Sequence, residues 1–394
     1  MTRALWSSGF RPFFLLGAAY GPLVLLGWLP VWLGWAQPAA AAQPQALWHG
    51  HELIYGFAAA FICGFVLTAL PSWAGTPEVT GAPLGALALI WLAGRAAAWC
   101  YPWVPLAAVA ALDLLLFPAL AACVLPGLAR ALDRRYMALL PLLLGFIAAD
   151  AIYFLAVADG AQGAAADALQ GALDVLVVLF AVIGGLLTPV FTESALQERG
   201  QSRLPALSKP VEIAAIASAV LFAAAGWPGV PPSVNGAVTC AAALIHAVRL
   251  MQWRTLSIVS TPLVLAMHVG YGWLVVAMGL RGIADAFGLV PRGAWIHAFT
   301  VGALGMMMLA LLNRVALRHT GRRASPSPAA VAGLGIMLLA GLVRVAASVI
   351  GAGGAWIAVS AAAWALPFAI FLVEHGAKLC RPSLPRADEP VLRT

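Results

Sequence analysis

The sequence predicts an all-α, polytopic membrane protein of about twelve transmembrane helices, and three observations predict this fold class. Of the 394 residues, 63% are hydrophobic and only 9% are charged, whereas a soluble domain carries about 25% charged residues. The apolar residues come in blocks of about twenty, the length that crosses a hydrocarbon core about 30 Å thick. Lys and Arg residues fall mostly on one side of these blocks. Such a composition excludes a water-soluble fold.

The spans follow from the apolar blocks and from the breaks between them. The first block, Phe13 to Trp35, follows Arg3 and Arg11 and exceeds the apolar region of about 7–15 residues in a signal peptide, so we interpret it as an uncleaved helix. Proline, glycine and short polar clusters separate the later blocks, and Gly226 to Pro232 is either a turn or a kink. No connection is long enough for a soluble domain, so residues 1–394 are predicted to form a single transmembrane domain. The predicted spans are 13–35, 49–71, 83–101, 104–128, 137–158, 169–191, 208–226, 233–250, 260–280, 293–315, 329–350 and 354–375.

Basic residues orient the predicted helices, because Lys and Arg are concentrated in cytoplasmic loops. Arg281 and Arg292 fall opposite the termini, while Arg95 and Arg344 fall inside helices. The predicted location is the bacterial inner membrane, with both termini in the cytoplasm. The net charge of +7 is explained by these anchors, so no nucleic-acid partner is expected. The eighteen basic residues on the side of the termini are Arg3, Arg11, Arg130, Arg134, Arg135, Arg199, Arg203, Lys209, Arg249, Arg254, Arg314, Arg318, Arg322, Arg323, Lys378, Arg381, Arg386 and Arg393.

Ionisable residues inside the spans share one depth. With a helical rise of about 1.5 Å per residue, five of them lie about 7–13 Å from the outer end of a span. An ionisable residue inside a span indicates a functional role by default. For any single one of these residues, an ion pair between helices is an equally good explanation. Their common depth predicts a polar site open to the periplasm. The five are Arg95, Asp113, Asp150, Asp174 and Arg344, and His49, His51, Glu52 and His297 lie at a similar level.

The histidines are candidate metal ligands, because imidazole is the commonest metal ligand in proteins; hydrogen bonding between helices is the alternative role. His49 and His51 are about 200° apart on a regular helix, so they do not share one metal unless the helix starts irregularly. His297 is level with them, and His268 is deeper, about 18 Å from the outer end of its span. His246, His319 and His375 lie at the cytoplasmic ends. Five cysteines without a C-x-x-C pair argue against a thiolate zinc site and a covalent c-type haem.

The chain resembles the NnrS family, membrane proteins associated with the bacterial response to nitric oxide and carrying haem and copper. The pattern departs from the family in one place, since Leu186 follows Gly184 and Gly185 where the family usually has arginine. The matching stretches are Gly9-Phe10-Arg11-Pro12-Phe13-Phe14, Trp48-His49-Gly50-His51-Glu52 through Gly56-Phe57, Gly64-Phe65 to Pro71-Ser72-Trp73, Trp91-Leu92-Ala93-Gly94-Arg95, Pro189-Val190-Phe191-Thr192, His297-Ala298-Phe299-Thr300-Val301-Gly302, and Arg314-Val315 to His319-Thr320-Gly321-Arg322.

The resemblance implies a b-type haem and copper but does not say which residue binds which. Their depth makes His51 and His297 the first choice for the haem or copper centre, with His49 close by. His268 is a candidate for a second metal centre or a proton path. Arg95 and Arg344 are candidates to pair with haem propionates, because guanidinium recognises carboxylate in a bidentate fork.

The function that the resemblance implies is action on nitric oxide at a periplasm-facing metal site, either by consuming NO or by protecting cellular iron from it. The carboxylates Glu52, Asp113 and Asp150 are the candidate catalytic groups, which could feed protons to a reductive step or only balance Arg95 and Arg344. A nitric oxide reductase-type oxidoreductase would need electrons from a partner such as membrane quinol. Two alternatives stay open: a twelve-helix secondary transporter, and a protein that handles haem or metal without turnover.

Overall fold

A computed structural model describes residues 2–36, 44–101, 103–131, 134–201, 204 and 206–385, and every regular element among them is helical. Arg203, Arg386 and Arg393 of the basic set lie outside the described residues. The first half contains α1 (Thr2–Leu5), α2 (Phe10–Trp32), α3 (Gln45–His51), η1 (Glu52–Ala58), α4 (Ala59–Ala74), α5 (Ala82–Trp99), α6 (Leu106–Asp113), α7 (Leu116–Arg130), η2 (Arg134–Ala138), α8 (Leu139–Ala158) and α9 (Gln162–Gln197). The second half contains α10 (Lys209–Ala225), α11 (Pro232–Met251), η3 (Thr255–Ile258), α12 (Pro262–Phe287), α13 (Arg292–His297), η4 (Ala298–Leu304), α14 (Gly305–Arg318), α15 (Pro328–Ile350) and α16 (Gly354–Leu379).

The structure confirms an all-α polytopic membrane protein. Among the described residues, eleven helical segments are long and apolar enough to cross a membrane. The remaining expected span, 208–226, coincides with α10, which has 17 residues. The segment from Gly226 to Pro232 is a turn rather than a kink, because α10 ends at Ala225 and α11 begins at Pro232.

Two spans differ from the expected single helix of membrane length. The span expected at 104–128 is two helices, α6 and α7, with a break at Leu114 and Leu115. The span expected at 169–191 is part of α9, which has 36 residues. Its first turns are rich in alanine, the strongest helix former. No glycine occurs in its last turns, and the first glycine after them is Gly200. The helix therefore continues at both ends past the apolar block.

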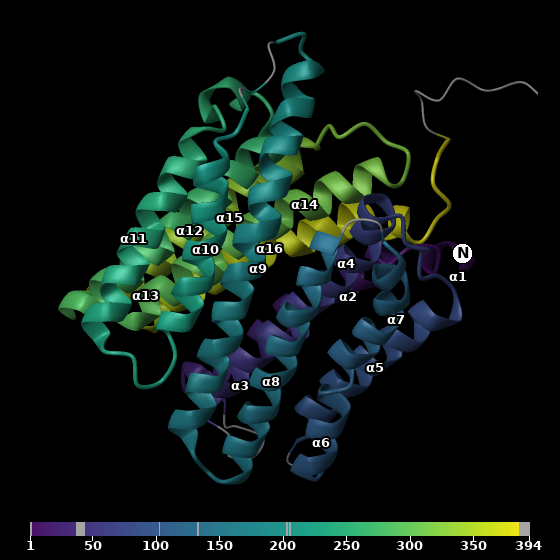
Figure 1. The fold of residues 1–394 in the computed structure, drawn as a ribbon. Coiled ribbons are helices and arrows are strands. Elements are labelled where there is room, and N and C mark those ends of the chain that lie inside the picture. The colour runs from purple at the N-terminus through teal and green to yellow at the C-terminus, as the bar shows by residue number, and fades with distance from the viewer. Residues whose placement is uncertain are drawn as a thin grey trace, which may run out of the picture.

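The start of α2 and the end of α16 lie on the same side of the molecule. Arg11, at the start of α2, donates hydrogen bonds from Nη1 to the carbonyl oxygens of Leu379 and Arg381, both at 2.7 Å. Figure 1 shows the N-terminus beside the end of α16. An even number of crossings requires this arrangement. The starts of α3, α9, α13 and α16 consequently share the opposite end of the bundle, which we call the distal end.

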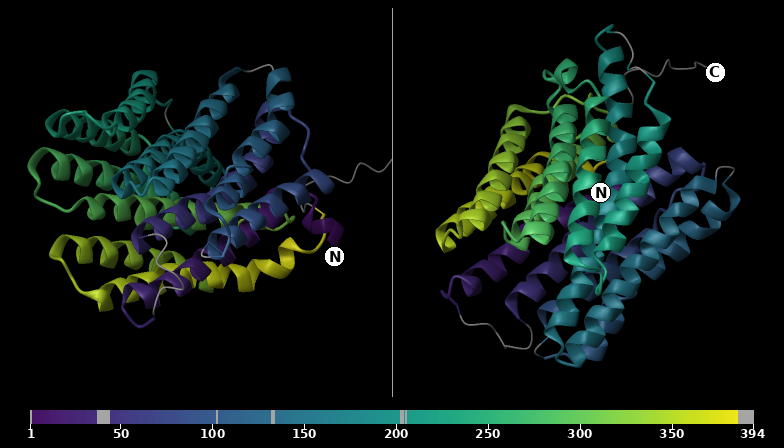
Figure 2. Two further views of the ribbon diagram at one scale, coloured as in Figure 1. Left: turned by 90° about the horizontal axis from the view of Figure 1, so that it is seen from below. Right: turned by 60° about the vertical axis from the view of Figure 1, so that its left-hand side comes forward.

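The long helix α9 separates two groups of helices. Figure 1 and the two views in Figure 2 show α5 to α8 on one side of it and α10 to α12 on the other. Helix α9 packs directly against α8, α10, α12 and α3. The segment Gln45–Ala74 is the most enclosed span, with 83% of its most apolar window buried, whereas the value is 28% for Gly354–Leu379. The helices that carry His49, His51 and Glu52 are therefore central, and α16 is the least enclosed of the candidate spans among the described residues.

Candidate functional site

The histidines of the two central distal segments share an unusual local structure. His51 is the last residue of α3 and His297 is the last residue of α13. Each is followed at once by a seven-residue π-helix, η1 after His51 and η4 after His297. Such π-helical turns are rare and occur frequently at functional sites. A π-helix after each of the two histidines indicates that both segments contribute side chains to a functional site.

The α3–η1 segment forms a wall between two different environments. His49, Gly50 and Leu53 line a cavity on one side of it. His51 and Glu52 are buried on the other side, in a network of charged residues. This agrees with the angle of about 200° expected between residues 49 and 51 on a helix. The two histidines therefore belong to separate sites.

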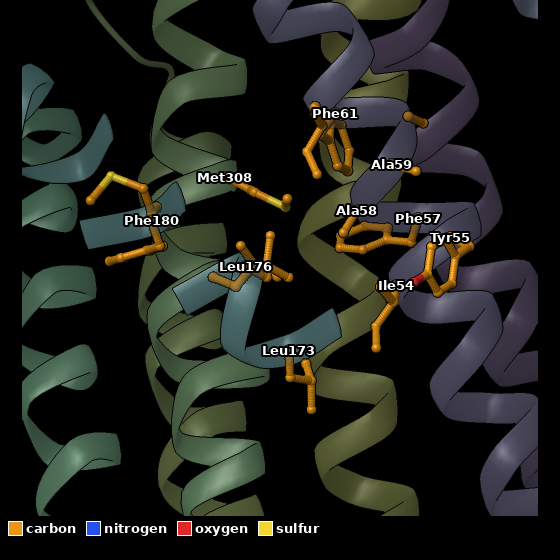
Figure 3. Packing of buried hydrophobic residues seen from close by; sticks show 14 of the residues in the cluster. Ile54, Tyr55, Phe57, Ala58, Ala59, Phe61, Leu173, Leu176, Phe180 and Met308 are labelled. Atoms are coloured by element: carbon orange, nitrogen blue, oxygen red, sulfur yellow. The ribbon is translucent and has the colours of Figure 1, made fainter. Parts of the chain in front are cut away.

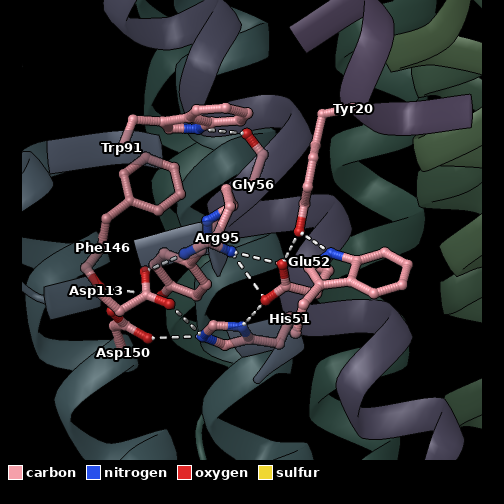
Figure 4. A network of polar contacts seen from close by, with 11 residues as sticks. Tyr20, His51, Glu52, Gly56, Trp91, Arg95, Asp113, Phe146 and Asp150 are labelled. Carbon is pink, nitrogen blue, oxygen red and sulfur yellow. Dashed lines mark hydrogen bonds and ion pairs between the residues drawn. The ribbon is translucent and has the colours of Figure 1, made fainter. Parts of the chain in front are cut away.

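The charged network joins five buried side chains from η1, α3, α5, α6 and α8 (Figure 4). His51 Nδ1 lies 2.9 Å from Glu52 Oε1, and His51 Nε2 lies 3.0 Å from Asp150 Oδ1. Arg95 Nη1 donates to Glu52 Oε1 and Oε2 at 2.8 and 2.9 Å. Arg95 Nη2 donates to Asp113 Oδ1. Four residues expected to be functional from their depth alone are thus in direct contact with one another or with His51.

Aromatic residues enclose the charged network. Tyr20 donates its hydroxyl hydrogen to Glu52, and Trp99 Nε1 donates to the Tyr20 oxygen at 2.9 Å. The ring of Tyr153 stacks on that of His51, with centroids 4.5 Å apart and planes 19° apart. Trp91 donates to the carbonyl oxygen of Gly56 at 2.9 Å, which fixes α5 against η1. These contacts hold the imidazole and the Glu52 carboxylate in one orientation and keep bulk water out.

Negative charge is in excess in the network. Glu52, Asp113 and Asp150 face the single guanidinium of Arg95, and His51 meets a carboxylate oxygen at each ring nitrogen. An imidazolium ring donates from both nitrogens, so this geometry fits a protonated His51. Asp113 Oδ2 and Arg95 Nε are buried and have no hydrogen-bond partner within the described part of the chain. The network can therefore accept a further proton or a cation.

A metal ion is one such cation, and it would replace the proton between His51 Nδ1 and Glu52 Oε1. Among the described residues, His51, Glu52 and Asp113 form the group whose ligand atoms all lie within 4.8 Å of one another. One nitrogen and carboxylate oxygens suit divalent transition metals, including Cu(II), better than Cu(I), which prefers sulfur. Asp150 holds the far ring nitrogen of His51, as carboxylates commonly do beside metal-binding histidines.

The cavity on the other side of α3 is largely apolar and has a volume of about 360 Å³. Residues of α2, α3, η1, α9, α13, η4, α15 and α16 line it. Three of its lining side chains can bind a metal or an anion, namely His49, His297 and Arg344. Ligand pockets of this kind combine apolar walls with a few convergent polar groups.

The cavity histidines have free coordinating capacity. His297 Nδ1 donates to the carbonyl oxygen of Gly293 at 2.6 Å, which leaves the lone pair on Nε2 for a ligand. His49 stacks on Trp28, with ring centroids 4.1 Å apart. His49 Nδ1 is buried without a hydrogen-bond partner among the described residues.

The guanidinium of Arg344 is also free of acids. Its Nη1 donates to Ser348 Oγ at 2.7 Å, one helical turn away on α15. Within the described ranges, no carboxylate forms an ion pair with Arg344. A cation without an acidic partner at the wall of an apolar cavity is suited to a ligand that carries an anionic group.

The remaining predicted residues lie elsewhere. Arg95 is held by Glu52 and Asp113 instead of lining the cavity. Asp174 pairs with Arg281, whose Nη1 lies 2.5 Å from Asp174 Oδ1. His268 hydrogen-bonds at both ring nitrogens to hydroxyls, those of Thr192 at 2.7 Å and Thr255 at 2.9 Å. Asp174 thus joins α9 to α12, and His268 has no free lone pair for a metal.

Sequence reasoning missed the aromatic partners of the site. Trp28 is buried at 6% exposure and stacks on His49. Tyr20 and Trp99 complete the Glu52 contacts. Tyr20 lies 32 residues from Glu52 in the sequence, and Trp99 lies 79 residues from Tyr20. Only the helical phase of Tyr20 and Trp28, which are eight residues apart on α2, could have indicated that both face inward.

The comparison with protein families agrees with this geometry. A family model described as NnrS protein matches residues 4–383. The match spans both histidine segments and all helices that line the cavity. Among the curated proteins no match is found.

Proposed function

The chain belongs to the NnrS family of nitric-oxide-response membrane proteins, and on this premise we propose that it binds haem in the cavity between His49 and His297 and acts there on nitric oxide. The observation that carries the proposal is the cavity itself. It brings two imidazoles with coordinating capacity and one guanidinium without an acidic partner to one apolar space.

The cavity suits haem in several independent ways. The apolar walls match the macrocycle, and about 360 Å³ falls in the range of pockets for small cofactors. The Nε2 atom of His297 and the ring of His49 would hold the haem. Arg344 is suited to a propionate, because guanidinium pairs with carboxylate. Arg95 is engaged by two acids, so we assign the propionate contact to Arg344 alone.

Copper is proposed at the charged network. His51, Glu52 and Asp113 would hold it, and Asp150 would orient His51 through Nε2. His268 is a weaker candidate, because threonine hydroxyls rather than carboxylates meet its two ring nitrogens. When bound, haem and copper supply the reactive metal and the redox chemistry that a neutral molecule such as NO requires.

The side chains of the network can also handle protons beside the cavity. Reduction of NO consumes protons, and Glu52, Asp113 and Asp150 are the carboxylates behind the cavity wall formed by Gly50 and Leu53. The contact from His51 Nε2 to Asp150 and the contact from Tyr20 to Glu52 form a path along which protons can shift. Tyr153 and Trp28 keep the two sites apart from bulk water. Electrons would come from a partner such as membrane quinol.

The site is proposed to face the periplasm. It lies at the distal end, opposite the termini, and the positive-inside rule places the termini in the cytoplasm of the inner membrane. NO is small and neutral, so it needs no polar entrance.

The test is to mix the reduced, purified protein with NO and to follow the haem spectrum and the NO concentration together. Sustained loss of NO indicates a reductase, and a spectral change that saturates at one equivalent indicates a scavenger or sensor. Haem without any response to NO indicates a protein that handles haem without turnover. A protein that binds no haem would overturn the proposal and favour the transporter reading.

A further inference from the structure

A second, smaller cavity lies next to the first one and has no role in the proposed chemistry. Its volume is about 90 Å³. It lies between α4, α9 and α14, on the side of the first cavity nearer the termini, since its lining residues come later along α4 and α14. All of its lining side chains are apolar, apart from Gly184, which has none. Figure 3 shows part of its wall, with Leu176 and Met308 between Phe180 and Phe61.

The two cavities share a wall. Leu176 of α9 and Leu304 of η4 line both of them. Leu304 is the last residue of the π-helix that follows His297, so the shared wall is attached to one of the proposed haem ligands. At the other side, Phe65, Leu179 and Leu311 line the small cavity and are only partly buried. Partly exposed apolar side chains therefore line one side of the small cavity, and the wall of the histidine cavity lines the other.

The chemistry of the lining selects the occupant. A space without polar groups stays dry, as in an engineered apolar cavity of about 150 Å³ that binds xenon or benzene. A quinol head group would find no hydrogen-bond partner here, and burying its hydroxyls unpaired is unfavourable. At about 90 Å³ the space suits a molecule of two or three heavy atoms better than a lipid chain.

We propose that this cavity is the route by which a small, uncharged gas passes from the bilayer core to the histidine cavity, with Leu176 and Leu304 as the gate between them. The inference rests on the proposed function for the identity of the gas and of its destination. The binding of an apolar gas in the small cavity does not depend on the proposed function. A gas that dissolves in lipid thus reaches the metal site without crossing the charged network.

The first experiment needs no cofactor. Xenon is applied to the full-length protein in detergent, and binding is followed by xenon NMR. We expect xenon to bind in both cavities of the native protein, and we expect Leu311→Trp, which fills the outer side of the small cavity, to remove the site in that cavity alone. Leu186→Trp on α9 is the matched control, because Leu186 is 43% exposed and lines neither cavity. The same number of xenon sites in folded Leu311→Trp as in the native protein would overturn the proposal.

The second experiment measures entry of gas to the haem. Carbon monoxide is photolysed from the reduced haem protein, and its bimolecular rebinding rate is recorded. We expect a several-fold slower rate in Leu311→Trp, a faster rate in Leu176→Ala, which widens the gate, and no change in Leu186→Trp. Equal rates in all variants with intact haem spectra would contradict the route. Absence of haem would instead refute the proposed function and leave the xenon result to decide whether this cavity takes up gas.

Discussion

Position in the fold separates the candidate ligands from the structural histidines. His297 and His49 line the large cavity, and each keeps a nitrogen that no described protein group engages. His246 and His375 also keep one such nitrogen, while the other one hydrogen-bonds to Tyr271 at 2.7 Å and to Asn313 at 3.0 Å, respectively. Both lie outside the two cavities, in the half of the molecule near the termini, so their position favours His49 and His297 as haem ligands.

Replacing His297 or His49 by Ala should therefore lower the haem content of folded protein, because each change removes a side chain that we propose to hold the haem. The measurement is the haem-to-protein ratio from the visible spectrum of the purified variants. His246→Ala and His375→Ala are the controls and should retain haem. His51→Ala should lower copper content and leave haem in place. Full haem occupancy in both His49→Ala and His297→Ala would contradict the assignment.

Arg95 is important for stability, because it is the one guanidinium within the charged network. Changing Arg95 to Met should destabilise the protein by about 3–5 kcal/mol, since buried carboxylates would lose their partner. Thermal unfolding in detergent measures the loss. The control is Arg292→Met, whose side chain is 71% exposed and pairs with Asp285; this pair should contribute about 1 kcal/mol or less. Equal unfolding temperatures for the two variants would contradict a stabilising role of Arg95 in the network.

At the scale of the elements, the π-helix η1 and helix α2 depend on a close approach at Gly56. A Cβ at this position would meet the Tyr20 ring, with Arg95 Cδ also only 3.1 Å away. The Tyr20 hydroxyl that contacts Glu52 would have to move. A glycine inside a helix is therefore retained here for packing, although it costs about 0.5–1 kcal/mol of helix stability relative to alanine.

Gly56→Ala should accordingly destabilise the protein by about 1–3 kcal/mol, the usual cost of overpacking. Gly171→Ala is the control on α9, because an added Cβ there meets nothing within 4 Å. That change should be neutral or stabilising by up to about 1 kcal/mol. The unfolding temperatures of the two variants show whether Gly56→Ala destabilises the protein and whether Gly171→Ala leaves its stability unchanged or raises it. A Gly56→Ala protein as stable as the native one would show that Tyr20 can shift without loss.

At the scale of the whole molecule, the side of the membrane that the site faces depends on how the helices are oriented. The start of α2 and the end of α16 meet on one side, and the charged network and the histidine cavity lie toward the other. The basic residues predict that the first side is cytoplasmic. Reporter fusions after residues 40, 163 and 286 should therefore report the periplasm, and fusions after 132, 200 and 325 the cytoplasm. Reversed reports at two consecutive sites would reveal a miscounted helix.

The sequence by itself determined the membrane class and the approximate positions of the helices, because apolar length and breaking residues are local properties. It also identified His49, His51, Glu52, Arg95, Asp113, Asp150, His297 and Arg344 as candidates, because ionisable groups are costly in lipid and are rarely placed there without a role. Depth along a helix follows from residue count alone. It therefore indicated that these residues are level, without indicating which of them meet.

The tertiary structure alone decided the partners. His51 and His297 were expected to share a centre, yet His51 joins Arg95, Asp113 and Asp150, while His297 shares the cavity with His49 and Arg344. The reason is angular: which face of α3 meets α5, α6 and α8, and which meets α13 and α15, depends on how the helices pack around α9. The π-helices after His51 and His297 add to this, because one extra residue per turn rotates all side chains beyond it. Neither packing direction nor a π-helical turn can be read from hydrophobic periodicity.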